Sequence, residues 1–233
     1  MRGRDCIVVM AREPVAGSTK TRLAAAIGAP EAASLYESFL LDTLATCGSL
    51  PAALLISYAP DGSRAEQYFR RIAPRAILAL QEEVAFGARL AAAMQAAFDR
   101  EFERVAVIGS DIPHLAAAWI QDAFTSLDDH DLALGPTQDG GYYLLALRTP
   151  NPRLFDDIDW SSGLELGQTH SRAGELELRV KEVQDTFDID DIGDLLALRE
   201  HVEANGVAVC PRTAAALALL DPAACSFVGT PVR

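Results

Sequence analysis

Short apolar runs rich in branched side chains alternate along this chain with longer stretches in which apolar residues recur every three to four positions. The short runs predict buried strands and the longer stretches predict amphipathic helices. Strands are expected within residues 6–11, 52–59, 75–80, 104–109, 131–136, 142–148 and 179–183. Helices are expected over residues 20–27, 31–47, 63–72, 86–102, 115–127, 164–173 and 191–204. This alternation is typical of an α/β fold, a mainly parallel mixed sheet flanked by helices.

The helix expected over residues 86–102 carries a stripe of large apolar side chains. The stripe consists of Phe86, Leu90, Met94, Ala97 and Phe102, which fall roughly along one helical face. Such a stripe favours packing against a sheet. We therefore interpret these aromatic and methionine side chains as core and not as part of a cofactor site.

The length and composition favour one large domain. The chain has 233 residues, of which 50% are hydrophobic, enough for a substantial core. We expect a single domain over residues 1–206 and a C-terminal extension over residues 207–233. The extension contains Pro211, Pro222 and Pro231, and we expect it to be packed on the domain or partly mobile.

The formal net charge of −13 argues against nucleic acid or an anionic membrane as a partner, because either would require a positive surface. The four cysteines form no C-x-x-C pair and do not alternate with histidines at metal-ligand spacing, so reduced thiols are expected; they are Cys6, Cys47, Cys210 and Cys225. No apolar run approaches the ~20 residues of a membrane helix, and no signal peptide is evident. These features together predict a cytoplasmic protein.

The stretch AREPVAGSTKTRL, residues 11–23, contains the materials of a phosphate-binding loop. It is not the nucleotide P-loop, because its only glycine, Gly17, is separated from Lys20 by two residues. A strand, a loop of small residues and a helix N-terminus still form an anion site. Lys20, Arg22 and Arg12 would add positive charge there.

The stretch VAVIGSDIPHL, residues 105–115, places Asp111 just after a buried strand. Open α/β sheets bind ligands at the carboxyl ends of their strands, and Mg²⁺ prefers oxygen ligands and bridges to phosphates. Asp111 is therefore a candidate metal ligand; the alternative is that it caps the following helix. His114 is interpreted as a turn or surface histidine, because Mg²⁺ rarely takes nitrogen.

The stretch DTFDIDDIGDLLAL, residues 185–198, supplies further carboxylates. Asp188 and Asp190 alternate on an extended segment and project to the same side, so either could join Asp111 at a metal ion. Asp191 and Asp194 have the spacing of a helix start and are interpreted as structural.

Two further motifs admit both a structural and a functional interpretation. Asp139-Gly140-Gly141 is typical of a hairpin turn, yet the glycines would also let a substrate approach the main chain, with Asp139 as a base or additional ligand. The spacing Ser162-x-x-Glu165 is that of a capping box. In the same segment, Trp160 could instead line a substrate pocket.

Taken in order, AREPVAGSTKTRL, GSDIPHL, LGPTQDGGYYLLAL, DWSSG and DIDDIGDL resemble the bacterial selenodomain-associated transferases, also labelled arsenosugar-biosynthesis glycosyltransferases. These belong to the glycosyltransferase-A (GT-A), or nucleotide-diphospho-sugar transferase, superfamily. The resemblance covers residues 6–204. More distantly, the first and third stretches are similar to 2-phospholactate guanylyltransferases and molybdenum-cofactor nucleotidyltransferases.

The resemblance implies that Gly17, Lys20 and Arg22 hold nucleotide phosphates and that Asp111 with Asp188 or Asp190 carries the divalent ion. It adds Gln81, Gly87 and Arg89, in QEEVAFGARL, as residues that face the nucleotide or acceptor. The chain departs from the family at Arg12, where lysine is more frequent, and at Asp191-Ile192, where the family motif usually continues Thr-Pro.

Three functions are compatible with these residues. The first is Mg²⁺- or Mn²⁺-dependent nucleotidyl transfer from an NTP to a small phosphorylated or carboxylate acceptor, because the basic loop suits a triphosphate. The second is glycosyl transfer from a nucleotide sugar, although Gly109-Ser110-Asp111 offers one carboxylate where the usual Asp-x-Asp has two. The third is nucleotide binding without turnover.

Overall fold

The computed structural model describes residues 4–220, so Pro222, Cys225 and Pro231 lie outside the described residues. The chain forms two compact units, and neither is continuous in sequence. The first, here the sheet unit, comprises Met1–Arg12, Thr46–Gly109 and Ala116–Phe187. The second, here the helical unit, comprises Glu13–Ala45, Ser110–Leu115 and Asp188–Arg233.

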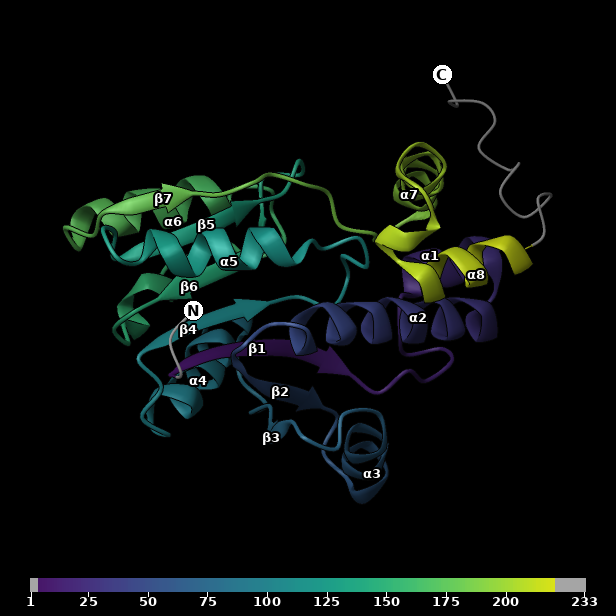
Figure 1. The fold of residues 1–233 in the computed structure, drawn as a ribbon, viewed down its shortest axis with the longest axis horizontal. Coiled ribbons are helices and arrows are strands. Elements are labelled where there is room, and N and C mark those ends of the chain that lie inside the picture. Colours follow the sequence, from purple (N-terminus) through teal and green to yellow (C-terminus); the bar gives the residue numbers. More distant parts are fainter. Residues whose placement is uncertain (1–3, 221–233) are drawn as a thin grey trace. The chain divides into compact units, whose positions relative to one another are not determined.

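The sheet unit contains a mixed seven-stranded sheet in the order β3-β2-β1-β4-β6-β5-β7 (Figure 1). The strands are β1 (Asp5–Arg12), β2 (Ala53–Ala59), β3 (Ile77–Leu80), β4 (Arg104–Ile108), β5 (Leu132–Pro136), β6 (Tyr142–Leu147) and β7 (Val180–Glu182). Only β6 runs antiparallel to its neighbours, β4 and β5. The predicted α/β class with a mainly parallel sheet is confirmed, and each predicted strand is present.

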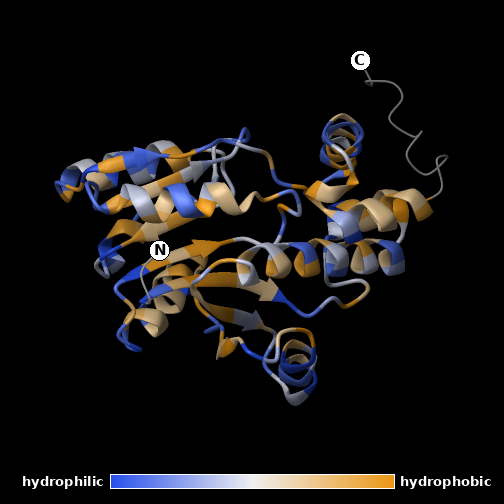
Figure 2. Cartoon of the chain, in the orientation of Figure 1, coloured by the Kyte–Doolittle hydropathy of each residue, from blue (hydrophilic) through white to orange (hydrophobic). Residues whose placement is uncertain are grey.

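The helices of the sheet unit bury the apolar side chains that the strand pattern predicted. They are α3 (Ser63–Ile72), α4 (Phe86–Phe98), α5 (Ala117–Ser126), η1 (Pro152–Phe155) and α6 (Glu165–Glu175). Alternate residues of β1 and β4, Cys6 and Val8 with Val105 and Val107, pack in one buried cluster with Met94 of α4. Figure 2 shows β1 and β4 coloured mainly as hydrophobic, as expected for strands buried on both faces.

Helix α4 is shorter than predicted and its stripe is only partly buried. It ends at Phe98, and Glu101 adopts φ 64°, a left-handed conformation that no helix continues. Phe102 therefore lies beyond the helix, although it still packs against the core. Phe86 is 42% exposed, so its interpretation as core was wrong.

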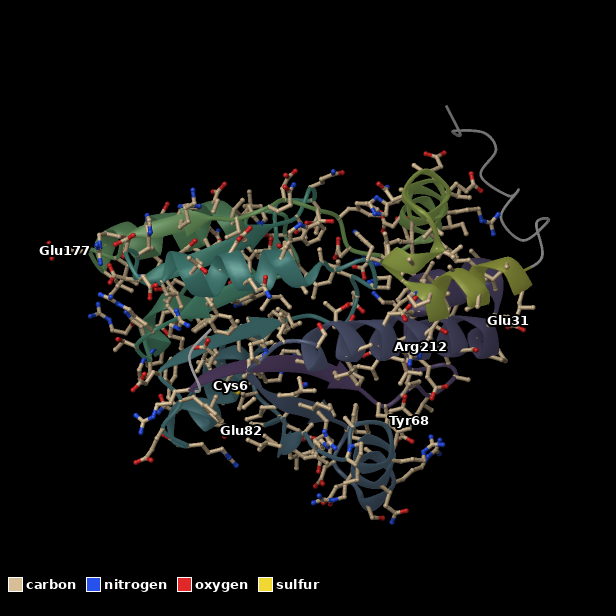
Figure 3. The ribbon with its side chains drawn as sticks, viewed as in Figure 1. Cys6, Glu31, Tyr68, Glu82, Glu177 and Arg212 are labelled. Carbon is tan, nitrogen blue, oxygen red and sulfur yellow. The ribbon has the colours of Figure 1, made fainter. Side chains whose placement is uncertain are left out.

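The helical unit contains α1 (Thr21–Ile27), most of α2 (Ala29–Gly48), α7 (Ile192–Asn205), η2 (Val207–Val209) and α8 (Pro211–Leu219). Helix α8 was not predicted, because the prolines of the C-terminal extension suggested an irregular tail. Pro211 is its first residue, a position where the missing N–H costs nothing. The buried carboxylate of Asp42 in α2 accepts hydrogen bonds from the backbone N–H groups of Arg212, which is labelled in Figure 3, and of Thr213.

The structure also tests the predicted start of α7 and the predicted state of the cysteines. Asp191 caps α7, and its side chain and that of Asp194 form the reciprocal bonds of a capping box, as predicted. Cys6, Cys47 and Cys210 are free and buried, which agrees with reduced thiols for these three.

Within residues 4–220, no helix has the length and hydropathy needed to cross a bilayer.

Candidate functional site

The helical unit brings together four predicted site residues from three distant parts of the chain. Lys20 Nζ lies 2.7 Å from Asp190 Oδ1 and 3.1 Å from Asp111 Oδ1. Arg22 Nη1 lies 3.6 Å from the other oxygen of Asp190. The Lys20 side chain is only 7% exposed, whereas those of Asp111 and Asp190 are 38% and 46% exposed. The site is therefore a pair of solvent-accessible carboxylates that converge on a buried ammonium group.

A compact loop positions Lys20. The buried Thr19 hydroxyl accepts a hydrogen bond from Val15 N at 3.1 Å and donates to Glu13 O at 3.4 Å, so it closes the loop across its base. Gly17 has φ 85°, and the space where a Cβ would stand is open. Lys20 itself is left-handed, with φ 49° and ψ 53°, and immediately precedes α1. Because α1 has only seven residues, we assign the positive charge of the site to side chains and not to a helix dipole.

Asp111 is fixed by contacts on its own backbone and on the residue before it. Ile189 N donates to Asp111 O at 3.1 Å, which aligns the segment of Asp190 beside it. Ser110 Oγ lies 2.8 Å from the phenol oxygen of Tyr36. Helix α5 begins after Ala116 without a side-chain cap, so the alternative that Asp111 caps it is wrong.

Asp190 is held by the start of α7. Asp194 Oδ2 accepts hydrogen bonds from Asp190 N and Asp191 N, both at 2.9 Å. Asp188 and Asp190 flank Ile189, whose side chain is fully buried. Of the two candidate ligands, Asp190 is the one whose carboxylate is paired with Lys20.

The electrostatics of the site favour the charged form of Lys20. Burial alone would lower the pKa of Lys20, but the carboxylates of Asp111 and Asp190 outweigh burial and raise this pKa to about 12.

His114 lies in the turn as predicted, but it is buried and not on the surface. Burial and the neighbouring His201 ring, 4.9 Å away, lower the pKa of His114 to about 4, so it is neutral at pH 7.

The donor set fits a magnesium ion that takes its remaining ligands elsewhere. Mg²⁺ is usually bound through one or two carboxylates, with water and substrate phosphates completing its shell. Asp111 and Asp190 already converge on one cationic atom, Lys20 Nζ. No cluster of three or more His, Cys, Asp or Glu side chains able to hold a metal occurs within residues 4–220.

The remaining predicted site residues belong to the sheet unit. Arg12 is exposed at the end of β1. Asp139, Gly140 and Gly141 form the hairpin turn between β5 and β6, as the first of the two interpretations predicted. Asp139 Oδ1 accepts hydrogen bonds from Thr137 Oγ1 at 2.6 Å and Gly141 N at 3.1 Å, which stabilises the turn.

Gln81 and the start of α4 lie in the segment that the family resemblance added. Gln81 Nε2 donates to Ser57 O at 2.7 Å and to Ala11 O at 3.4 Å, so it ties together the carboxyl ends of β1 and β2. The role of Gln81 at a nucleotide stays a prediction.

An aromatic cluster surrounds Gly87 and Arg89 and was not predicted as such. The Trp160 ring packs edge-on against Phe86 with centroids 4.9 Å apart, and a Cβ at Gly87 would stand 2.7 Å from Trp160 Nε1. Arg89 lies over the Phe86 ring at 5.4 Å. Its buried Nε finds no hydrogen-bond partner in the described part of the chain. The sequence pattern placed Phe86 in the core, and its exposure was the information needed to predict this cluster.

The predicted capping box before α6 forms only in part. Glu165 Oε1 accepts from Ser162 N at 2.9 Å, as in a capping box. Ser162 Oγ accepts instead from Leu164 N at 3.2 Å, and Leu164 is the residue that precedes the helix. This segment is therefore structural at Ser162 and Glu165, in agreement with the first interpretation.

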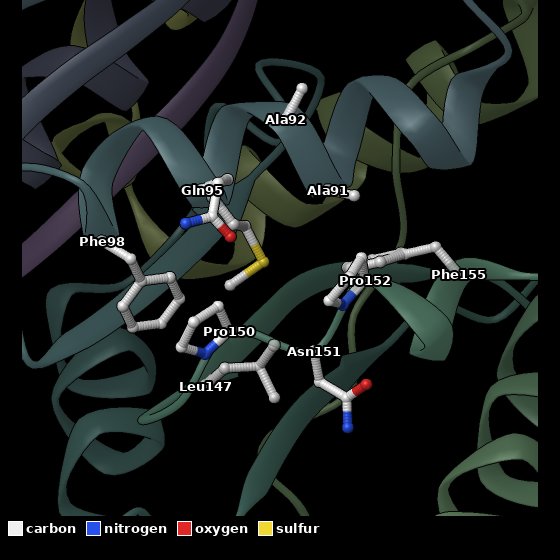
Figure 4. A pocket seen from close by; sticks show the side chains of 10 residues that line it. Ala91, Ala92, Gln95, Phe98, Leu147, Pro150, Asn151, Pro152 and Phe155 are labelled. Carbon is white, nitrogen blue, oxygen red and sulfur yellow. The ribbon is translucent and has the colours of Figure 1, made fainter.

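The sheet unit also has a pocket of about 280 Å³ (Figure 4). Met94 and Phe98 of α4, Leu147 of β6 and Phe155 of η1 line it. Leu147 pairs with Val105 at the beginning of β4, so the pocket lies at the amino end of that strand. Ligands of open α/β sheets bind at the carboxyl ends, so we do not assign this pocket to the substrate.

Comparison with known proteins agrees with the fold. A family model described as "Uncharacterized protein conserved in bacteria (DUF2064)" matches residues 40–162. The chain belongs to this family. Comparison with the curated proteins finds no match.

Comparison with solved structures shows what this chain resembles. A protein from Desulfovibrio desulfuricans G20, described as a "putative nucleotide-diphospho-sugar transferase", is 33% identical, with 94% of this chain and 95% of that chain covered and a TM-score of 0.87. A nucleotidyl transferase from Methanothermobacter thermautotroptrophicus is 15% identical, with 86% and 99% covered and a TM-score of 0.57. A CMP:2-keto-3-deoxy-manno-octonic acid synthetase complexed with CTP is 14% identical, with 86% and 99% covered and a TM-score of 0.53. This DUF2064 protein therefore has a GT-A-like fold.

Proposed function

We propose that this DUF2064 protein is a Mg²⁺-dependent nucleotidyltransferase that moves a nucleotidyl group from an NTP to a small phosphorylated or carboxylate acceptor. The observation that carries the proposal is the convergence of Asp111 and Asp190 on the Lys20 ammonium, beside Arg22. Two carboxylates next to two basic side chains suit a metal-bound triphosphate. The carboxylates can bind the metal, and the basic side chains can pair with the phosphate oxygens. The nucleotidyl transferases among the structures of the same fold support the reaction class.

The proposed reaction asks for positioning and charge neutralisation from the protein. An acceptor oxygen attacks the α-phosphorus of the NTP, the bond from this phosphorus to the bridging oxygen breaks, and pyrophosphate leaves with the electron pair. Bound at Asp111 and Asp190, a Mg²⁺ ion would supply Lewis-acid stabilisation of phosphate charge. Lys20 and Arg22 would offset the charge of the departing pyrophosphate.

A second candidate function is glycosyl transfer from a nucleotide sugar. It is favoured by the description of the Desulfovibrio desulfuricans protein, which is 33% identical over nearly the whole chain. The selenodomain-associated, or arsenosugar-biosynthesis, subfamily is our proposal for the position of this chain within the superfamily and is compatible with either reaction. In the glycosyl reaction Asp139 would be the candidate base, with its Oδ1 also occupied in the hairpin turn.

One assay separates the two reactions. The purified protein is incubated with Mg²⁺, each NTP and a panel of phosphorylated and carboxylate acceptors, and pyrophosphate is measured; a parallel series with nucleotide sugars measures released nucleoside diphosphate. We expect pyrophosphate in the first series. Nucleoside diphosphate from the second series without pyrophosphate from the first would establish glycosyl transfer instead.

Variants link the activity to the site. Asp111→Asn and Asp190→Asn should each lower kcat by about 100-fold or more, as expected when a group that stabilises phosphate charge is lost. Glu203→Gln on the exposed surface of α7 makes the same change of charge away from these residues and should retain activity. Equal activity of Asp111→Asn and Glu203→Gln would contradict the proposed metal role.

A further inference from the structure

Lys20 occupies the position that a cation bound by Asp111 and Asp190 would require. Its Nζ is within hydrogen-bonding distance of one oxygen of each carboxylate, and its side chain is almost completely buried. One ammonium group thus pairs with both proposed metal ligands. A divalent ion bound by the same two oxygens would come close to this ammonium, and two cations that share ligands repel each other.

The backbone of Lys20 is fixed, but its flexible side chain could pair with other anions. Thr19 is tied to Val15 and Glu13 through its hydroxyl, which holds the loop immediately before Lys20. The ammonium itself sits on a flexible four-carbon stem. Phosphate oxygens of a bound nucleotide would offer it new anionic partners, so the carboxylates could be released to the metal without leaving Lys20 unpaired.

We propose that Lys20 is a built-in counter-ion that competes with the divalent metal for Asp111 and Asp190, so that metal and nucleotide bind as a coupled pair. This inference rests on the proposed function, in which nucleotide phosphates and a metal share the site. Coupling is reciprocal: if nucleotide strengthens metal binding by removing Lys20 from the carboxylates, metal strengthens nucleotide binding by the same factor. Metal binding to the nucleotide-free protein is therefore weak.

The first test measures Mn²⁺ binding to the full chain without nucleotide, by electron paramagnetic resonance of free Mn²⁺. Lys20→Gln should bind Mn²⁺ at least about 10-fold more tightly than the wild type, within the usual range of coupling between sites. Arg22→Gln removes a charge whose side chain is 73% exposed and 3.6 Å from Asp190, so its gain should stay below about 3-fold because solvent screens it. Adding Asp111→Asn to Lys20→Gln should abolish the gain.

The second test needs no variant. Lys20 and Lys181 are the only lysines of the chain, so lysine-selective isotope labelling gives two side-chain signals, with the exposed Lys181 as an internal control. In the nucleotide-free wild type, Mg²⁺ alone should leave the Lys20 signal in place. An NTP with Mg²⁺ should shift the Lys20 signal and leave that of Lys181 unchanged.

The outcomes separate this inference from the proposed function. Mn²⁺ affinity in folded Lys20→Gln that is equal to or weaker than in the wild type overturns the inference even if pyrophosphate is released from an NTP. An unmoved Lys20 signal on addition of Mg²⁺ and an NTP that binds overturns it as well, and this measurement stands if Lys20→Gln does not fold. A gain of Mn²⁺ affinity without any transfer reaction supports the competition and contradicts the nucleotidyltransferase.

Discussion

The phenol oxygen of Tyr36 lies 2.8 Å from the hydroxyl oxygen of Ser110, and both side chains are buried. Ser110 immediately precedes Asp111, so this hydrogen bond connects α2 with the backbone that carries a proposed metal ligand. Burial raises the free-energy cost of losing this hydrogen bond, because water cannot easily replace the missing partner there.

Removal of either hydroxyl should destabilise the protein modestly. We expect Tyr36→Phe and Ser110→Ala each to lower the free energy of unfolding by about 1 kcal/mol, the usual value for one hydrogen bond. The double variant should lose less than the sum of the two, because the same bond is removed in both. Urea unfolding of the four proteins measures this. Strict additivity would show that the two hydroxyls do not interact.

The sequence identified candidate side chains for the site but not how they are arranged. Asp111 was identified from its place after an apolar run, and Asp188 and Asp190 from their alternation on an extended segment. The sequence pattern does not show in which direction each side chain points. Lys20 was therefore assigned to phosphates, and its pairing with both carboxylates emerged only from the structure.

The fold shows the same division. Seven short apolar runs were enough to locate the strands, since burial on both faces leaves little ambiguity in sequence. Helix α8 was missed because Pro211 was interpreted as a breaker and not as a first helical residue. The end of α4 was missed because nothing in Asp99, Arg100 or Glu101 announces a left-handed residue.

Gly140 should tolerate no side chain. It has φ 92°, and a Cβ at this position would collide with the backbone carbonyl of Gly163. Gly140→Ala should therefore lower the free energy of unfolding by about 1–3 kcal/mol through strain and displacement of the turn. Gly174→Ala is the control, because Gly174 lies in α6 and its Cβ would meet nothing within 4 Å.

The control should be neutral or gain up to about 1 kcal/mol, the helix preference of alanine over glycine. Thermal and urea unfolding of both variants give the comparison. A Gly140→Ala protein as stable as Gly174→Ala would show that the hairpin turn can move away from Gly163.

Asp131 should contribute stability that depends on pH. Its hydrogen bonds with Arg179, which immediately precedes β7, hold the pKa of this carboxyl at about 2, below its usual value, and Arg148 adds to the effect. A lowered pKa means that the contribution is fully present above about pH 4 and is lost as the pH falls toward 2. Because the Arg179 side chain is 57% exposed, we expect about 1 kcal/mol or less.

The measurement compares urea unfolding of the wild type with Asp131→Asn from pH 7 down to pH 3. The wild type should be more stable at neutral pH, and its advantage should shrink below about pH 4, where the Asp131 carboxylate of the unfolded chain begins to be protonated. An advantage that is constant with pH would mean that packing, and not charge, accounts for it.

The ion pair between Asp5 and Arg104 allows a comparison of buried and exposed charges in one unit. Arg104 Nε and Nη2 bind the two oxygens of Asp5 at 2.7 and 2.8 Å, and Asp5 is only 1% exposed. Arg104→Leu leaves this carboxylate without its main partner and also removes the hydrogen bond to Phe124 O. We expect a loss of about 3–5 kcal/mol in the free energy of unfolding.

Arg4→Leu is the matched control for this loss. Arg4 Nη1 lies 2.8 Å from Glu103 Oε1, a similar distance, but both side chains are more than half exposed, so the loss should stay below about 1 kcal/mol. The double variant Asp5→Leu, Arg104→Leu should be more stable than Arg104→Leu alone, because no buried charge is left unpaired. Urea unfolding of the four proteins decides this. Equal losses for Arg104→Leu and Arg4→Leu would mean that water reaches Asp5 once its partner is gone.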